Sequence, residues 1–199
     1  MYIHELEDWP GWRWNTERLA SSLAEVRYRQ GRLIGRMEAL GFALREQAVL
    51  ETLTADVVTS SEIEGEKLDV EQIRSSVARR LGLDIGALRP AEHYVEGVVE
   101  VMLDATQHYS DALTTERLFS WHAARFPTGR SGMRKITVGA WRDDSAGPMQ
   151  VVSGPIGRER VHFQTPAAPH VDREVAAFLD WFNGHLDIDE VLKAALAHL

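Results

Sequence analysis

Apolar residues recur at three- and four-residue steps through most of this 199-residue chain, and this period constrains its fold more than any other feature. The longest such run follows Asn15, a residue type that commonly caps a helix, and it stops where Gly41 breaks the pattern. Its apolar positions are Leu19, Leu23, Val26, Leu33, Ile34, Met37 and Leu40. They predict an amphipathic helix that buries one face.

Further helices follow from the same period and from cap residues. Asp69 and Gln72 form a capping-box pattern, and Gly82 closes the helix that they open. The other predicted helices are residues 45–65, residues 91–108, one that starts after Thr114 or Thr115, residues 170–183, and a last one after an Asp187 cap. The fold class predicted is mainly α, a helical bundle.

The period changes to two in one part of the chain. Residues 135–141 and 159–164 alternate as strands do, and the turn-forming segment 143–148 lies between them. A short apolar run, residues 149–152, follows the turn. The pattern predicts a β-hairpin or three short strands, inserted over about residues 135–165 and packed on a partner.

Aromatic residues crowd the beginning of the chain, where Trp9, Pro10, Trp12 and Trp14 leave no room for a regular helix. Aromatic side chains at this density usually bury against a neighbouring element. We therefore expect an arm that packs on the helical body. The alternative is an exposed aromatic binding site.

Composition and motifs exclude several functions. The net charge of −8 argues against a nucleic-acid partner, although Arg79, Arg80, Arg130, Arg134 and Lys135 leave a local basic patch open. There are no cysteines, the histidines lack ligand spacing, and neither a phosphate loop nor a serine nucleophile elbow is present. No metal ligand or catalytic residue is assigned. No apolar run is long enough for a membrane, so the expected location is the cytoplasm.

One short segment breaks a local rule. Glu62, Glu64 and Glu66 crowd the end of the predicted helix 45–65, where the helix dipole favours cations. Gly65 suits the left-handed position that ends a helix. Ser60 lies one turn before Glu64 on the same face and could orient its carboxylate, whereas Glu62 and Glu66 face elsewhere. Such a conflict is found at functional sites and also on ordinary surface helices.

Ser60, Glu64 and Gly65 match a known pattern, serine or threonine, three residues, glutamate, then glycine or asparagine. The chain resembles Fic-family proteins, in which this pattern marks an inhibitory helix, and the resemblance covers essentially its whole length. It implies an N-terminal helical region with the inhibitory helix over residues 1–110. Residues 111–199 resemble the first half of a Fic domain, with the strands of about 135–165 as a flap.

The resemblance implies roles for particular residues. Ile136, Val138, Val161 and Phe163 would dock the target protein on the flap. The family signature, His-Pro-Phe-x-x-Gly-Asn-Gly-Arg, is absent, and the last helix resembles the one that leads into it. The chain is therefore expected to be truncated before its catalytic motif and inactive by itself.

The implied activity of the complete enzyme is transfer of AMP from ATP, with Mg²⁺, to a Tyr, Ser or Thr hydroxyl of a target protein. Glu64 would inhibit it by occupying the arginine that binds the γ-phosphate. Two alternatives stay open, a Fic enzyme that removes AMP and a non-catalytic regulatory or protein-binding module. The sequence does not identify the target protein, and it leaves open whether the chain forms a homodimer.

Overall fold

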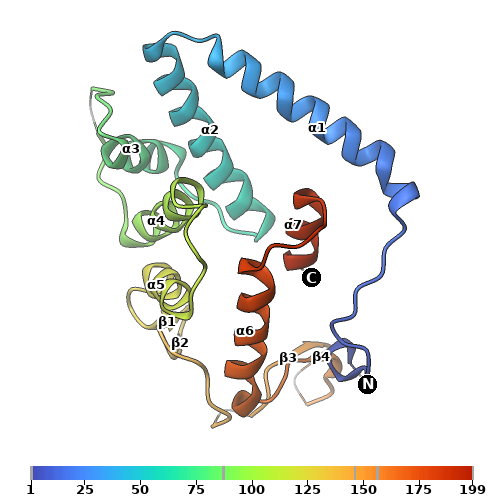
Figure 1. Cartoon of the computed structure of the whole chain (residues 1–199). Coiled ribbons are helices and arrows are strands. Elements are labelled where there is room, and N and C mark those ends of the chain that lie inside the picture. The colour runs from blue at the N-terminus through green and yellow to red at the C-terminus, as the bar shows by residue number, and fades with distance from the viewer. Residues whose placement is uncertain (1, 87, 146, 156, 199) are drawn as a thin grey trace. The chain divides into compact units, whose positions relative to one another are not determined.

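The computed structural model describes residues 2–86, 88–145, 147–155 and 157–198. Its described part is mainly helical, with two small antiparallel sheets (Figure 1), which confirms the predicted fold class. The chain divides into two compact units, Met1–Tyr28 with Ala140–Leu199, and Arg29–Gly139. The predicted division at residues 110 and 111 falls inside the second unit, between two helices that pack on each other.

The second unit is built from successive helices. They are α2 (Phe42–Ile63), α3 (Val70–Leu81), α4 (His93–Gln107) and α5 (Thr115–Arg125), followed by β1 (Arg130–Ser131) and β2 (Arg134–Lys135). In Figure 1, α3 and α4 lie against α2, and α5 lies against α4. The core between α2, α3 and α4 consists of Leu50, Leu53, Val57, Ile73, Val77, Ala78, Val95, Val99 and Leu103. All of these positions lie in segments predicted as helices.

A polar cluster joins α3 and α4 in this unit. Buried Ser76 on α3 donates to the Glu96 carboxylate on α4 at 2.9 Å, and Glu96 also binds Arg79 and Arg80. Burial by itself would raise the pKa of Glu96, but the hydrogen bonds from Ser76 and Arg79 and the nearby charges hold that pKa below its usual value. The cluster therefore keeps a charged carboxylate between α3 and α4.

The cap residues behave largely as predicted. Asn15 accepts from the Arg18 amide at 2.9 Å, and the Asp69 side chain accepts from Glu71 and Gln72 amides at 2.9 and 3.2 Å. The second half of the predicted capping box is not formed. The Gln72 side chain instead accepts from the Glu92 amide at 2.9 Å, because the loop before α4 reaches it.

The remaining caps are Thr114, which accepts from the Arg117 amide at 3.2 Å, and Gly82, which has a φ of 71°. The predicted Asp187 cap is wrong. Asp189 accepts from the Val191 amide at 2.8 Å, so α7 (Glu190–His198) starts about half a turn later than its sequence pattern indicated.

The first unit contains the N-terminal arm with η1 (Ile3–Glu5), the start of α1 (Thr16–Glu38), β3 (Gln150–Ser153), β4 (Arg160–Gln164), α6 (Ala168–Asn183) and α7. The beginning of the arm packs on β4. The ring centres of Tyr2 and His4 each lie 5.6 Å from the ring centre of Phe163. Trp14 lines a small cavity of about 140 Å³ with Leu19, Leu23 and Leu192. Further along α1, Leu33 and Ile34 stay exposed.

Only part of the predicted β region forms strands. β3 and β4 pair antiparallel, with Val151 opposite Phe163, Val152 opposite Val161, and an irregularity between these pairs. The predicted strand over residues 135–141 is wrong beyond its first residue. Lys135 pairs with Arg130 in the separate β1–β2 pair, and residues 136–141 form no strand. Gly139 takes a φ of 65°, which an alternating strand does not allow.

Candidate functional site at the end of α2

The C-terminus of α2 is closed by a Schellman motif. The Gly65 amide donates to the Glu62 carbonyl at 3.0 Å, and the Glu66 amide donates to the Ser61 carbonyl at 2.8 Å. Gly65 has a φ of 79°, a backbone conformation that glycine adopts without the steric cost of a Cβ. The prediction that Gly65 ends this helix in the left-handed conformation is therefore confirmed. Glu64 is the last residue before this turn, at the C-cap.

The Glu64 side chain is exposed and free. Among the described residues, none forms an ion pair or a hydrogen bond with its carboxylate. The helix dipole of α2 places partial negative charge at the same point, so the site favours an incoming cation. Glu62 and Ile63 are exposed beside it, and Ile63 has 78% of its surface accessible.

Ser60 does not orient Glu64 through its side chain. The Glu64 amide donates to the Ser60 carbonyl at 3.4 Å, which is a helical backbone contact. Within the described ranges, the Ser60 hydroxyl forms no hydrogen bond with the Glu64 carboxylate, and both side chains are exposed. The sequence placed these two residues on one face correctly, but their contact is not made in this state.

Glu66 has a partner that sequence reasoning missed. Its Oε2 atom lies 2.9 Å from Nη2 of Arg125, the last residue of α5. The guanidinium carbon of Arg125 lies 4.5 Å from the centre of the Tyr94 ring on α4. No spacing in the sequence relates residues 66, 94 and 125, so only the packing of α2, α4 and α5 reveals this cluster.

A cavity of about 490 Å³ opens beside the Glu66–Arg125 pair. It is lined by Glu66, Glu92, His93, Tyr94, Arg125, Phe126, Pro127, Thr128, Arg130, Ser131 and Gly132. Two polar atoms in its wall, Glu66 Oε2 and the Tyr94 hydroxyl oxygen, are shielded from solvent and accept or donate no hydrogen bond within the described chain. The cavity has charged groups of both signs and lies next to the end of α2.

The predicted flap residues fall in two different places. Val161 and Phe163 lie on β4, where Val161 is exposed and Phe163 is half-buried under the N-terminal arm. Ile136 and Val138 are half-buried and lie outside any strand, in the other compact unit. The hairpin exposes apolar side chains at Met149, Val151, Val152 and Val161. Among the described residues, no third strand pairs with the β3–β4 hairpin.

Two negative findings concern the described part of the chain. It contains no group of three or more His, Asp or Glu side chains that could hold a metal ion. None of the helices in the described ranges combines the length and the apolar character that crossing a membrane requires.

Comparison with known proteins gives a partial match to one family. Residues 2–83 match the model of DUF4172, a domain of unknown function. The matched segment runs from the N-terminal arm through α1, α2 and α3, and it contains Ser60, Glu64 and Gly65. The match thus covers the α2 C-terminus and ends two residues after α3, at the start of the loop that leads to α4.

A second similarity is to a ribosomal protein. The large ribosomal subunit protein bL17 of Streptococcus equi subsp. zooepidemicus is 27% identical over 114 residues, which are 54% of this chain and 89% of that protein. The bL17 proteins of two Streptococcus thermophilus strains match with the same identity and the same coverage.

Proposed function

We propose that this chain is the N-terminal part of a Fic-type protein AMP transferase, and that Glu64 inhibits AMP transfer in the complete enzyme. The observation that carries the proposal is the state of Glu64. Its carboxylate lies at the hydrogen-bonded C-terminal turn of α2, is exposed, and has no cationic partner among the described residues. An inhibitory carboxylate of this family has to be available to an arginine, and this one is.

The physical basis of inhibition is competition for one cation. A carboxylate and a guanidinium pair in a bidentate geometry, so Glu64 would occupy the arginine that otherwise binds the γ-phosphate of ATP. Only a few kcal/mol of differential binding is needed to shift such a balance. The motif residues Ser60 and Gly65 contribute through the backbone, which places Glu64 at the C-cap.

ATP and Mg²⁺ supply the AMP group and the neutralisation of phosphate charge in this chemistry. No residue of this chain is assigned to either. The described residues contain no carboxylate or histidine cluster suited to a metal ion. The anion-binding signature of the family is not part of the sequence. The role proposed for this chain is therefore regulatory and target-binding.

The β3–β4 hairpin supports the target-binding part of the proposal. Among the described residues, no further strand pairs with the outer edge of either strand, and the apolar side chains of Val151 and Val152 are 58% and 47% exposed. An extended segment of a target protein can add to such an edge through main-chain hydrogen bonds. Val161 lies opposite Val152 on the partner strand.

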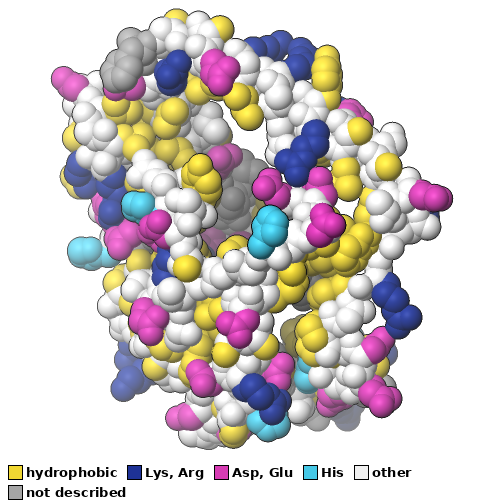
Figure 2. Space-filling view, in the orientation of Figure 1, with side chains coloured by type: hydrophobic (Ala, Val, Ile, Leu, Met, Phe, Trp, Pro, Cys, Tyr) yellow, Lys and Arg dark blue, Asp and Glu magenta, His cyan; other side chains and the backbone are white. Residues whose placement is uncertain are grey.

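The similarity to bL17 would instead suggest a ribosomal, RNA-binding role, and the charge of this chain opposes it. The net charge is −8, and Figure 2 shows acidic and basic side chains interspersed over the visible face. Arg79 and Arg80, which the sequence left open as part of a basic patch, are paired with Glu96 and Glu100. Their charges are thus partly neutralised within the fold.

The decisive experiment compares charge-removing variants of the complete protein that contains this chain. Glu64→Gly and Glu64→Gln should each raise the rate of AMP transfer tenfold or more, if the lost competition is worth over ~1.4 kcal/mol. The matched control is Glu62→Gln, which lies on the same helix end, is also exposed, and should leave the rate unchanged. Transfer is followed with labelled ATP, and melting temperatures confirm equal stability. A Glu64 variant no faster than its parent would refute the inhibitory role.

A further inference from the structure

We propose that Glu66 and Arg125 form a positioning pair that anchors the inhibitory end of α2 to α5. The regulatory consequence of this inference rests on the proposed function, while the anchoring itself does not. Glu66 follows Glu64 by two residues and is the last residue of the Schellman motif. Whatever holds Glu66 therefore also limits where the Glu64 backbone can lie.

Burial singles out Glu66 within its segment. From Glu62 to Lys67 it is the one residue that is not exposed. Its Oε2 atom is shielded from solvent, accepts no hydrogen bond, and lies 2.9 Å from Arg125 Nη2. A shielded carboxylate oxygen without its cation is unfavourable, so removing the Arg125 charge should drive Glu66 outward.

Arg125 is itself held in place by two features. It stacks over the Tyr94 ring of α4 at 4.5 Å, and it is the last residue of α5, where a cation interacts favourably with the helix dipole. The side chain of Arg125 is 28% exposed, against 37% for Glu66. The pair thus ties the α2 terminus to a cation that α4 and α5 have already fixed.

The consequence concerns the freedom of Glu64. Because the Glu64 side chain forms no ion pair or hydrogen bond in the described part of the chain, its position is set by the backbone turn from Glu62 to Glu66. With the pair intact, this turn is fixed at both ends, by the helix on one side and by Arg125 on the other. With the pair broken, the turn can open without loss of the buried core.

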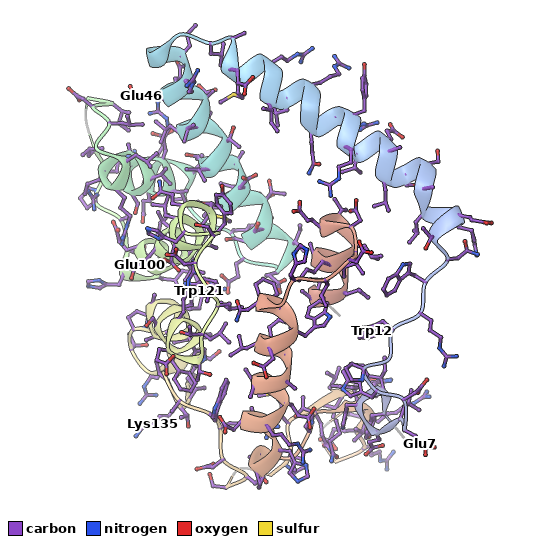
Figure 3. The ribbon with its side chains drawn as sticks, viewed as in Figure 1. Glu7, Trp12, Glu46, Glu100, Trp121 and Lys135 are labelled. Carbon is purple, nitrogen blue, oxygen red and sulfur yellow. The ribbon has the colours of Figure 1, made fainter. Side chains whose placement is uncertain are left out.

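The anchoring is tested on the 199-residue chain by hydrogen exchange of the amides of Glu64, Gly65 and Glu66. Glu66→Gln and Arg125→Gln should each speed this exchange about fivefold, the size expected for loss of one partly exposed ion pair. The double variant should exchange no faster than either single one. The control is Glu100→Gln, which removes the Arg80–Glu100 pair between α3 and α4 (Glu100 is labelled in Figure 3) and should leave these amides unchanged. Exchange that is unaltered in both single variants would overturn the anchoring.

The regulatory consequence is tested in the complete protein. Glu66→Gln should raise AMP transfer about fivefold in the parent, by the same argument, and should add nothing when Glu64→Gly is already present. If Glu64→Gly raises transfer and Glu66→Gln does not, the positioning role is wrong and the proposed function stands. If Glu64→Gly itself has no effect, the proposed function fails together with the regulatory consequence, and the exchange measurement still decides the anchoring.

Discussion

Gly97 on α4 lies so close to Ala124 on α5 that a Cβ built on Gly97 would stand 1.8 Å from the Ala124 carbonyl oxygen. No side chain can occupy that position unless one of the two helices moves. The contact is between backbones, so a flexible side chain cannot absorb the clash. Gly97 thus sets the separation of α4 and α5, and with it the place of Arg125 at the end of α5.

The first prediction is that Gly97→Ala destabilises the protein by ~2 kcal/mol or more, because overpacking of a tight contact outweighs a gain in helix propensity of about 1 kcal/mol. The control is Gly35→Ala in α1, where a Cβ meets nothing within 4 Å. That variant should gain stability by up to ~1 kcal/mol. Urea unfolding of both variants measures the difference. A stabilised Gly97→Ala protein would show that the helices are not held at this distance.

The second prediction concerns Asp104, which accepts from Arg117 Nε at 2.6 Å and from the Trp121 indole at 2.7 Å, and also contacts His108 (Trp121 is labelled in Figure 3). The hydrogen bond from Arg117, together with those from Trp121 and His108, lowers the pKa of Asp104 below its usual value. A lowered folded-state pKa stabilises the fold above the unfolded pKa, and this contribution disappears as the pH falls through the folded value.

Asp104→Asn should therefore lower the melting temperature by several degrees near neutral pH, and this gap should close as the pH falls below about 4. Circular dichroism melts across this pH range provide the measurement. Asp56→Asn, at an exposed position of α2, serves as the control and should follow the parent at every pH. A gap that persists unchanged in acid would mean that the charge of Asp104 does not stabilise the fold.

The third prediction concerns the hairpin. In the complete protein, Val161→Pro should abolish modification of the target while ATP binding survives, because proline removes an amide and bends the strand that would dock an extended segment. Val161→Thr keeps the amide and the β-branched shape, so it should reduce modification only slightly. Target labelling and ATP binding are measured side by side. Equal loss of both activities in Val161→Pro would assign the hairpin a structural role instead.

Local signals explain why most of the helices could be predicted. Side-chain periodicity and caps act within a few residues, so Asn15, Asp69 and Gly82 mark helix ends without any tertiary information. The predicted cap at Asp187 was wrong because a second aspartate, Asp189, lies half a turn later and caps the helix in its place. The strand over residues 135–141 failed for a different reason. Strands require a partner, and β1 pairs with residues 134–135 alone.

Part of the candidate site could likewise be predicted from the sequence, and part could not. Ser60, Glu64 and Gly65 are neighbours in the sequence, so their order alone determined a helix that ends in a left-handed glycine with a carboxylate at its cap. Other features were decided only by the tertiary structure. The Glu64 carboxylate has no ion-pair or hydrogen-bond partner among the described residues, and Glu66 pairs with Arg125. Ile136 and Val138 belong to one compact unit, whereas Val161 and Phe163 belong to the other. The physical reason is the sequence separation between the residues that interact. Capping and helix periodicity depend on hydrogen bonds spanning a few residues, whereas an ion pair between residues 66 and 125 depends on the packing of α2, α4 and α5.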